Sequence, residues 1–282
     1  MTAGTLLSLG HGYSARAVAE LLLPFGWTIT GTTRSANKAQ ALESTGVTPR
    51  VVPDEDLTPD LAKATHLLIS ASPDADGDPF LPLIADALET HKPGWIGYLS
   101  TTGVYGDHQG GWVDEDTPCT PGNTRGKWRV QAEHQWLDHG AHIFRLAGIY
   151  GPGRGPFSKV RNGTARRIIK PGQVFGRIHV DDIAQVVVAS VAKPDPGRIY
   201  NVCDDEPAPP EDVLGYAAEL LGLPLPPEED FETAEMTPMA RSFYAESRRV
   251  RNDRIKTELG VKLRYPDYRA GLQALLAAET VA

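Results

Sequence analysis

The sequence has little cysteine and a deficit of positive charge. Only two cysteines, Cys119 and Cys203, occur among 282 residues, and they lie far apart. Neither a disulfide framework nor a zinc site is therefore expected, and no His, Cys or carboxylate cluster has metal-ligand spacing. Lys and Arg number 28 against 36 Asp and Glu, which gives a net charge of −8. A surface of this sign repels phosphate backbones, so we expect no nucleic-acid partner.

Long apolar runs are also absent. Nothing approaches the ~18 consecutive apolar residues of a membrane-spanning helix. The N-terminus, MTAGTLLSLGHGYSAR, lacks a basic stretch before its short apolar run and so lacks the pattern of a signal peptide. The sequence contains neither a P-loop nor a G-x-S-x-G elbow. We expect a soluble, cytoplasmic protein without a membrane partner.

What is present is an ordinary globular composition, with 41% hydrophobic and 23% charged residues. The length is about twice that of a usual single domain, which predicts one large or two intimate domains. Short apolar runs alternate with helical patterns through the first half. Strands are expected at 6–9, 27–32, 50–52, 66–71, 95–100 and 141–146, with helices at 15–22, 80–90 and 129–139. This alternation predicts an α/β fold, a Rossmann-type doubly wound parallel sheet.

The second half differs in charge. Residues 204–235 carry eleven acidic side chains and no Lys or Arg, and several prolines punctuate them. Residues 161–177 hold five basic and no acidic side chains, and residues 241–256 hold six basic and two acidic. We interpret this half as a smaller, looser domain that lies over the edge of the sheet. Its basic stretches make a small anionic ligand compatible with the negative net charge.

A glycine turn lies between the first expected strand and helix. Gly10, Gly12 and Ala15 fit the pattern G-x-G-x-x-A, with Tyr13 and Ser14 between them. The first glycine makes a tight turn, the second lets the backbone approach a pyrophosphate, and the small third residue lets helix and strand pack closely. We predict a dinucleotide site here, with Ser70 and Ala71 at the end of the fourth strand also in it.

The end of the second strand predicts which dinucleotide is bound. An NAD site usually places an Asp or Glu there for the ribose hydroxyls, but residues 31–38 (GTTRSANK) contain no acid. Arg34 offers a planar fork for a 2′-phosphate, Lys38 a second charge, and Thr33 and Ser35 hydroxyl groups. We therefore predict NADP rather than NAD. The alternative is that Arg34 and Lys38 are solvated loop charges.

Five further segments carry a family resemblance when taken in order. They are LSTTGVYG (99–106), RLAGIYGPG (145–153), IHVDDIA (178–184), IYNVCDD (199–205) and RVRNDRIKTELG (249–260). With the glycine turn, the chain resembles the extended short-chain dehydrogenase/reductases, the group that contains nucleotide-sugar epimerases and dehydratases. The resemblance implies a Rossmann domain of residues 1–153 with 178–202, and a substrate domain of residues 154–177 with 203–282. It also implies a monomer or a homodimer.

The resemblance implies catalytic positions and shows a departure from them. Thr101 matches the Ser or Thr that polarises the substrate oxygen, although it could simply cap the strand end. The family's Tyr-x-x-x-Lys relay should precede Glu133, but Arg125 and Arg129 stand in those two places. Arginine cannot donate a proton near neutral pH, although it can stabilise an oxyanion or hold a phosphate. This departure matches atypical members of the family.

Other residues are weaker candidates for chemistry. Tyr105 is the first choice for a substitute proton donor, ahead of the candidates Asp86, His108, Asp114 and Glu115. We interpret His179 as a structural residue at a helix start. The arginines available for an anionic substrate, such as a nucleotide diphosphate, are Arg154, Arg166, Arg167, Arg248 and Arg249. They could equally be ordinary surface charges.

Three functions remain open from the sequence. The first is an NADP-dependent oxidoreductase or epimerase/dehydratase-like enzyme with a non-standard active site. Its substrate is an unidentified small molecule, for which a nucleotide-linked or other anionic compound is one alternative. The second is a catalytically inactive NADP-binding sensor or regulatory protein that kept the fold. The third is a structural module whose glycine turn binds no dinucleotide.

Overall fold

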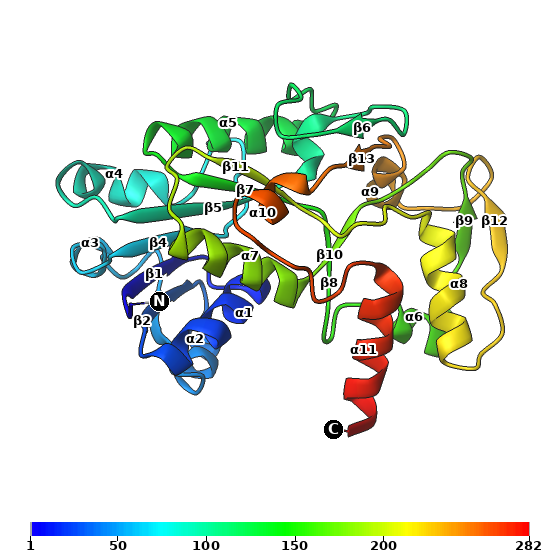
Figure 1. The fold of residues 1–282 in the computed structure, drawn as a ribbon, viewed down its shortest axis with the longest axis horizontal. Helices are drawn as coiled ribbons and strands as arrows, with labels where there is room; N and C mark the ends of the chain where they lie inside the picture. Colours follow the sequence, from blue (N-terminus) through cyan, green and yellow to red (C-terminus); the bar gives the residue numbers. More distant parts are fainter. Residues whose placement is uncertain (1, 282) are drawn as a thin grey trace.

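The computed structural model describes the backbone of residues 2–281. Its centre is a seven-stranded sheet in the order β11-β7-β5-β4-β1-β2-β3, in which every neighbouring pair is parallel (Figure 1). The strands are β1 (Thr5–Leu9), β2 (Thr28–Thr33), β3 (Thr48–Val51), β4 (His66–Ile69), β5 (Trp95–Thr101), β7 (His142–Leu146) and β11 (Ile199–Val202). The predicted Rossmann-type sheet is confirmed, and β11 adds a seventh strand beside β7.

Helices cover both faces of this sheet, because its strands are apolar on both sides. The helices of the main body are α1 (Tyr13–Leu22), α2 (Ala36–Glu43), α3 (Thr58–Leu61), α4 (Leu81–Thr90), α5 (Thr124–Asp138) and α7 (Val180–Ala192). One core lies between the sheet and α1, α2 and α7, and includes Val18 and Ile183. The other lies beneath α4 and α5 and includes Ile84 and Trp136.

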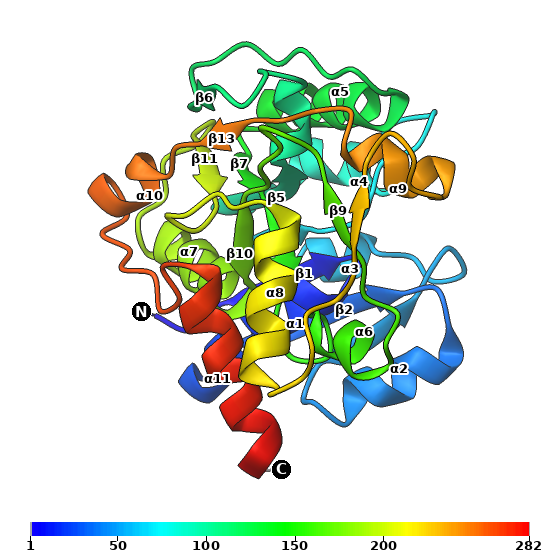
Figure 2. The ribbon, with the colours of Figure 1, turned by 90° about the vertical axis from the view of Figure 1, so that its right-hand side faces the viewer.

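Most of the remaining elements lie beyond the carboxyl ends of the strands, on the right of Figure 1, and face the viewer in Figure 2, whereas α10 packs against β11. They are β6 (Trp112–Val113), β8 (Gly148–Tyr150), α6 (Phe157–Arg161), β9 (Arg167–Ile169), β10 (Arg177–His179), α8 (Pro210–Leu220), β12 (Glu228–Asp230), α9 (Pro238–Phe243), β13 (Arg249–Val250), α10 (Asp253–Thr257) and α11 (Tyr268–Val281). A separate small core joins α6, α8 and α11 through Phe157, Ala217 and Leu272. This part is therefore packed in its own right.

Helix α5 differs from the expectation in a way that matters for the site. The periodicity predicted a helix over 129–139, but α5 begins at Thr124. Asn123 is its N-cap, and the Asn123 side chain accepts a hydrogen bond from the Gly126 amide at 2.8 Å. The earlier start places Arg125 and Arg129 one turn apart on one helix. Within residues 2–281, no helix combines the length and apolar character that crossing a membrane requires.

Candidate functional site

The glycine turn has the geometry that a pyrophosphate requires. Gly10 has φ +75°, and a Cβ there would lie 2.9 Å from the Ala71 backbone nitrogen, so only glycine is accommodated. At Gly12, a Cβ would have the Gly10 oxygen at 3.6 Å as its nearest contact, so the space above it is open. Gly12 is also the N-cap of α1, so no capping side chain occupies the first amides of this helix. The open space and free helix N-terminus fit a bound phosphate group.

Neighbouring strand ends hold this turn in place. The Gly10 amide donates to Thr32 Oγ1 at 2.7 Å, and the His11 amide donates to the Thr32 carbonyl at 3.0 Å. From β4, the Ser70 hydroxyl donates to the Gly10 carbonyl at 2.5 Å. Ser70 and Ala71, both expected at the cofactor, thus contact the turn itself. The turn is fixed by hydrogen bonds from strands on both sides.

The end of β2 presents unpaired positive charge beside the turn. Arg34 and Lys38 are exposed, and neither forms an ion pair or side-chain hydrogen bond within residues 2–281. Ser35 is the N-cap of α2, but its hydroxyl makes no cap bond, and its amide donates to Thr33 Oγ1 at 3.4 Å. The four residues expected to bind a 2′-phosphate therefore lie together with free donor groups.

His11 is a part of this site that the sequence did not single out. It is 5% exposed, and its Nδ1 lies 2.9 Å from Ser8 Oγ. A Cβ at Gly31 would lie 2.8 Å from the His11 ring, so glycine in β2 makes room for it. Burial, with a smaller effect of Arg16, lowers the pKa of His11 to about 4. The imidazole beneath the turn is therefore neutral near pH 7.

A cavity of about 930 Å³ lies at the carboxyl ends of β5 and β7. Thr101, Arg125 and Arg129 line one side of it, and Phe243 and Arg248 line the other. We call this cavity the reaction pocket. Thr101 Oγ1 accepts a hydrogen bond from the Gly103 amide at 3.1 Å, so Thr101 both caps the turn at 102–105 and faces the pocket. Its hydroxyl hydrogen remains available to a ligand.

The two arginines of α5 differ in their surroundings. Arg125 is exposed, and no ion pair or side-chain hydrogen bond holds it within the described chain. Arg129, in contrast, bridges two strand ends: its Nη1 donates to the Leu99 carbonyl at 3.1 Å and the Tyr98 hydroxyl at 3.0 Å. Its Nη2 donates to Ser72 Oγ at 3.3 Å. Arg129 therefore orders the pocket wall, while Arg125 is free to bind a ligand.

Tyr105 does not reach the reaction pocket. Its ring is fully buried, and its hydroxyl donates to Asn201 Oδ1 at 2.7 Å and accepts from Arg145 Nη1 at 3.0 Å. Burial raises the pKa of Tyr105 to about 12, despite the nearby guanidinium. Asp86, His108, Asp114 and Glu115 also lie outside the residues that line either cavity described here. None of these five expected alternatives is placed to exchange a proton with a ligand in the pocket.

The motifs that carried the family resemblance form a buried polar network. Arg145 of β7 binds the Glu133 carboxylate at 2.8 Å, and the side chains are 5% and 2% exposed. The Ser100 hydroxyl donates to the same carboxylate, and Tyr105 and Asn201 continue the network to β11. The network joins β5, α5, β7 and β11 beneath the pocket, so it sets the positions of Thr101 and Arg129 without contacting a ligand.

The acidic stretch neutralises part of the expected anion-binding set. Arg166 pairs with Glu229 at 2.8 Å, and Arg167 pairs with Glu228 at 2.7 Å. Arg167 lines neither cavity. Arg249 also lies outside both, and its Nη1 donates to the Gly110 carbonyl. The sequence alone could not show these pairings, because the partners are about 60 residues apart.

Arg248 and Arg154 are the two expected arginines that stay near the site without losing their charge to the acidic stretch. Arg248 Nη1 donates to the Gly106 carbonyl and to Glu246 at 2.8 Å, while Arg248 lines the reaction pocket. Arg154 is exposed and lies over the Tyr13 ring, 5.6 Å from its centre. The Tyr13 hydroxyl donates to the Pro152 carbonyl at 3.0 Å. Tyr13 thus fastens the loop that carries Arg154 onto the glycine turn.

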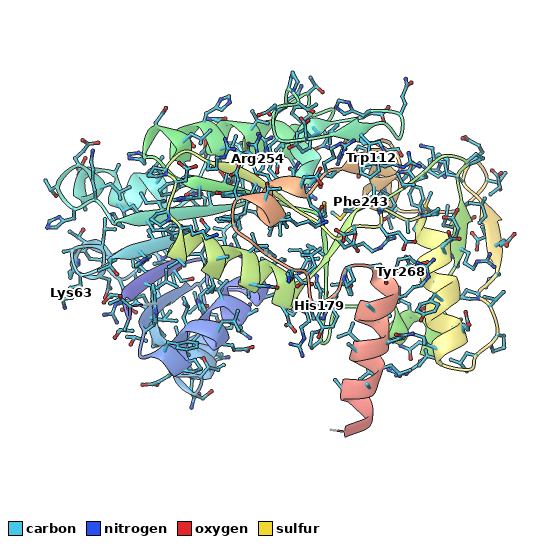
Figure 3. All side chains as sticks on the ribbon, viewed as in Figure 1. Lys63, Trp112, His179, Phe243, Arg254 and Tyr268 are labelled. Atoms are coloured by element: carbon cyan, nitrogen blue, oxygen red, sulfur yellow. The ribbon has the colours of Figure 1, made fainter. Side chains whose placement is uncertain are left out.

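His179 has a structural place, as expected. It lies at the start of α7 (Figure 3), where its side chain is the N-cap and accepts from the Asp181 amide at 3.2 Å. Its ring packs on Tyr265 with 4.1 Å between centres. Asp182 accepts from the Arg264 and Tyr265 amides at 2.7 and 3.0 Å. Among residues whose side chains are described, no group of His, Cys, Asp or Glu could hold a metal ion.

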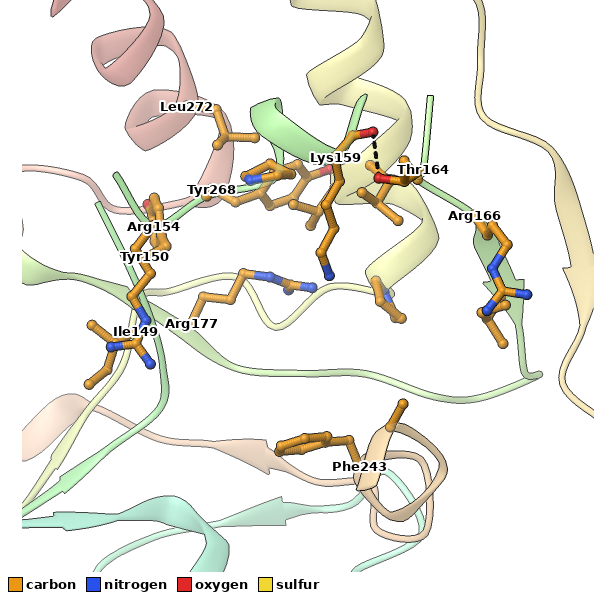
Figure 4. Close-up of a pocket in the computed structure, with 18 of the residues that line it drawn as sticks. Ile149, Tyr150, Arg154, Lys159, Thr164, Arg166, Arg177, Phe243, Tyr268 and Leu272 are labelled. Carbon is orange, nitrogen blue, oxygen red and sulfur yellow. Dashed lines mark hydrogen bonds between the residues drawn. The ribbon is translucent and has the colours of Figure 1, made fainter. Parts of the chain in front are cut away.

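A second cavity of about 710 Å³ adjoins the reaction pocket. The two share Ile149, Tyr150, Arg177 and Phe243. Figure 4 shows Lys159 and Arg177 projecting into this second cavity. Neither residue was singled out from the sequence, because only the tertiary structure brings Lys159 of α6 and Arg177 of β10 to one cavity.

Comparison with known proteins places the chain in a family, although no family model matches it. Protein YeeZ of Escherichia coli K12 is 30% identical over 92% of this chain and 95% of its own. The 3-diazoavenalumate denitrifying reductase of a Streptomyces species is 32% identical over 57% of this chain and 58% of its own.

Solved structures agree with this placement. A "functionally unknown conserved protein" from Silicibacter pomeroyi is 60% identical over 98% of this chain and 99% of its own, with a TM-score of 0.95. A "putative NAD-dependent epimerase/dehydratase" from Methylobacillus flagellatus is 28% identical over 99% of this chain and 100% of its own, with a TM-score of 0.75. The Bacillus anthracis dTDP-glucose 4,6-dehydratase, in complex with NAD, shares the fold at 15% identity and a TM-score of 0.79, over 99% of this chain and 97% of its own. The chain therefore belongs to the extended short-chain dehydrogenase/reductases, the group of NAD(P)-binding, epimerase/dehydratase-like proteins.

Proposed function

We propose that this protein is an NADP-dependent oxidoreductase that acts on a small anionic substrate without the family's Tyr-Lys proton relay. The observation that carries the cofactor assignment is the unpaired Arg34 at the end of β2, where an NAD site would have a carboxylate. Lys38 adds a second unpaired charge close by in the sequence. Both are placed to neutralise a 2′-phosphate on the ribose nearest the glycine turn.

The residues present fit a dinucleotide that runs from Arg34, at the end of β2, to the reaction pocket. The free amides at the start of α1 would hold the pyrophosphate above Gly12, and the nicotinamide would supply or accept a hydride when bound. Thr101 would donate its hydroxyl hydrogen to the substrate oxygen. Arg125 would place positive charge near that oxygen, which stabilises negative charge that develops there. Arg248, whose charge Glu246 balances, would offer hydrogen-bond donors.

Support for a reaction without a side-chain proton relay comes from the lining of the pocket. Its titratable residues are arginines, Glu246 and Tyr150. Glu246 accepts from Arg248, and burial raises the pKa of Tyr150 well above its usual range, so its phenol holds its proton firmly. A proton that the product requires would therefore come from water.

The cofactor assignment is tested by titrating NADPH and NADH against nicotinamide fluorescence. We expect NADPH to bind at least about tenfold more tightly, a difference of about 1.4 kcal/mol. Arg34→Ala should remove this preference, whereas Lys63→Ala, an exposed change at the far end of the molecule in Figure 3, should leave it unchanged. Tighter binding of NADH by the unaltered protein would refute the assignment.

The second candidate function is a non-catalytic NADP-binding sensor. It is favoured by Arg129, which takes the relay lysine's place and is committed to structural hydrogen bonds with Tyr98 and Leu99. The two functions are separated by oxidation of NADPH in the presence of a panel of anionic carbonyl compounds. Turnover that is lost in Thr101→Val supports the enzyme. NADPH binding without turnover, and turnover gained on restoring Arg125→Tyr with Arg129→Lys, supports the sensor.

A further inference from the structure

The lining of the second cavity combines positively charged side chains with apolar ones. It lies among α6, α8, α9 and α11 and opens to the reaction pocket at Arg177 and Phe243 (Figure 4). Its charged lining residues are all cations: Arg154, Lys159, Arg166 and Arg177. No Asp or Glu lines it, although the protein as a whole carries a net charge of −8. Such a local excess of positive charge attracts an anion.

The cations of this cavity are not equally available. Glu229 already pairs with Arg166. Lys159 forms no ion pair or side-chain hydrogen bond within the described chain, and its amino group projects into the cavity (Figure 4). Arg177 Nη1 donates to the carbonyls of Phe175 and Ala208 at 2.9 and 3.0 Å, so its guanidinium is fixed in place. Lys159 and Arg177 are therefore the pair best placed to bind an anion.

Arg177 forms no salt bridge with Asp204, the carboxyl group that has the strongest electrostatic effect on it. Asp204 is 2% exposed, and neither of its carboxyl oxygens has a hydrogen-bond partner within the described residues. Burial raises the pKa of Asp204 well above its usual range, which favours the uncharged form. Asp204 lies outside the lining of both cavities. The donors of Arg177 that Phe175 and Ala208 leave free therefore remain for a ligand on the cavity side.

The uncharged part of the lining is mainly apolar and aromatic, and its hydroxyl groups come from Thr164, Tyr150, Tyr244 and Tyr268. Tyr268, Leu272 and Val213 are buried beneath it, and no Asn, Gln, Asp, Glu or His side chain of the described residues lines it. Sugar hydroxyls enclosed here would find no carboxylate or amide acceptor, and an unpaired buried hydroxyl is costly. Phe243 and Met239 of α9 are 64% and 54% exposed while lining the pockets. An apolar ligand would bury both side chains favourably.

We propose that the substrate is an aromatic carboxylate rather than a sugar nucleotide. Its carboxylate binds Lys159 and Arg177, its apolar skeleton lies against Phe243 and Tyr268, and its reactive end extends into the reaction pocket toward Thr101. Only the placement of the reactive end toward Thr101 rests on the proposed function. The carboxylate site does not depend on it, so binding measurements test that site without turnover.

The test is calorimetric titration of the full-length protein saturated with NADP⁺. The probes are 2-naphthoate, its neutral counterpart 2-naphthalenemethanol, and UDP-glucose. We expect 2-naphthoate to bind in the micromolar to low-millimolar range, and the neutral compound to bind at least about tenfold more weakly because it lacks the charge. UDP-glucose should neither bind more tightly nor displace 2-naphthoate. Tighter binding of UDP-glucose, or no naphthoate binding at about 5 mM, overturns the proposal.

Variants locate the site. Lys159→Gln should weaken 2-naphthoate about tenfold, and Phe243→Ala should weaken it to a similar degree. Both positions are exposed, so the fold should tolerate the changes. Lys63→Gln is the matched control, an exposed lysine remote from the cavity (Figure 3). An unchanged affinity in Lys159→Gln overturns the assignment of this cavity.

Measuring NADPH binding in the same variants separates this inference from the proposed function. Lys159→Gln should leave NADPH affinity within about twofold, because Lys159 lies neither at the glycine turn nor in the lining of the reaction pocket. If the unaltered protein does not bind NADPH, the proposed function is wrong. If NADPH binds but the substitutions leave 2-naphthoate affinity unchanged, only the carboxylate site is wrong.

Discussion

The guanidinium of Arg145 and the carboxylate of Glu133 form a buried ion pair at 2.8 Å, between β7 and α5. Arg145 Nε lies 3.2 Å from both carboxylate oxygens, and Ser100 donates to the same carboxylate. A pair so fully hydrogen-bonded holds its partners in one geometry, because loss of either charge leaves the other buried and alone. Ser100 and Arg145 thus connect two of the segments, 99–106 and 145–153, that carried the family resemblance.

Removing one partner of this pair should destabilise the protein strongly. Glu133→Ala is expected to lower the free energy of unfolding by about 3–5 kcal/mol, because it leaves the Arg145 guanidinium without its counter-charge. Urea unfolding followed by circular dichroism measures this loss. The exposed Glu89→Ala, on α4, should change the free energy by less than about 0.5 kcal/mol. Equal effects of the two substitutions would contradict the role of the pair.

Substitutions of Gly10 and Gly12 should affect two different properties of the turn, its stability and its ability to bind a dinucleotide. Gly10→Ala forces a side chain into positive φ and against Ala71, and should destabilise by about 1–3 kcal/mol. Gly12→Ala meets open space, so the free energy of unfolding should change by less than about 1 kcal/mol while NADPH binds at least about tenfold more weakly. Thermal unfolding and NADPH titration of both variants check this. A Gly12→Ala protein with normal NADPH affinity would show that the pyrophosphate does not pass there.

Tyr105 should matter for stability rather than for proton transfer. Tyr105→Phe removes hydrogen bonds to Asn201 and Arg145, and should lower the free energy of unfolding by about 1–3 kcal/mol. NADPH affinity should stay within about twofold, because the ring lies outside the pocket. Unfolding and NADPH titration are the measurements. If Tyr105→Phe retained full stability but lost turnover on a substrate that the unaltered protein accepts, its placement beneath the pocket would be wrong.

His11 should give the protein a component of acid sensitivity. Because its folded-state pKa is about 4 against 6.5 in the unfolded chain, the unfolded state takes up the proton first as the pH falls. The stability that the neutral imidazole contributes is fully present above pH ~6.5 and is lost progressively as the pH falls toward ~4, by up to about 3 kcal/mol. His11→Asn should flatten the curve of unfolding free energy between those values. An identical slope in the variant would show that other histidines, such as His66 and His142, carry the effect.

Much of the cofactor site could be predicted from sequence, because its parts are local. Gly10, Gly12 and Ala15 lie within six residues, and Arg34 follows the next strand directly. Strand and helix periodicity also predicted the parallel sheet, since each apolar run reports burial on both faces. Helices α2 and α3 were not expected, and some bounds moved, as at α5, where a polar cap at Asn123 began the helix before its apolar pattern did.

The second half was less predictable, because its charges act across long distances in the chain. Arg166 and Arg167 looked available until the structure paired them with Glu229 and Glu228. Lys159 lies just before the basic stretch 161–177, and nothing local distinguishes it from a solvated lysine. Its place beside a ligand site depends on the fold, which brings Lys159 and Arg177 to one cavity.

The sequence by itself determined the fold, the family and the turn that suits a dinucleotide, because backbone geometry at glycine and alternating burial are local properties. Only the tertiary structure decided which polar residues serve the core and which face a ligand. Tyr105 and Arg129 are committed to hydrogen bonds with residues from other strands, whereas Arg125 and Lys159 remain free. The sequence shows which side chains are charged, but whether a charge is neutralised depends on the partners that folding brings close to it.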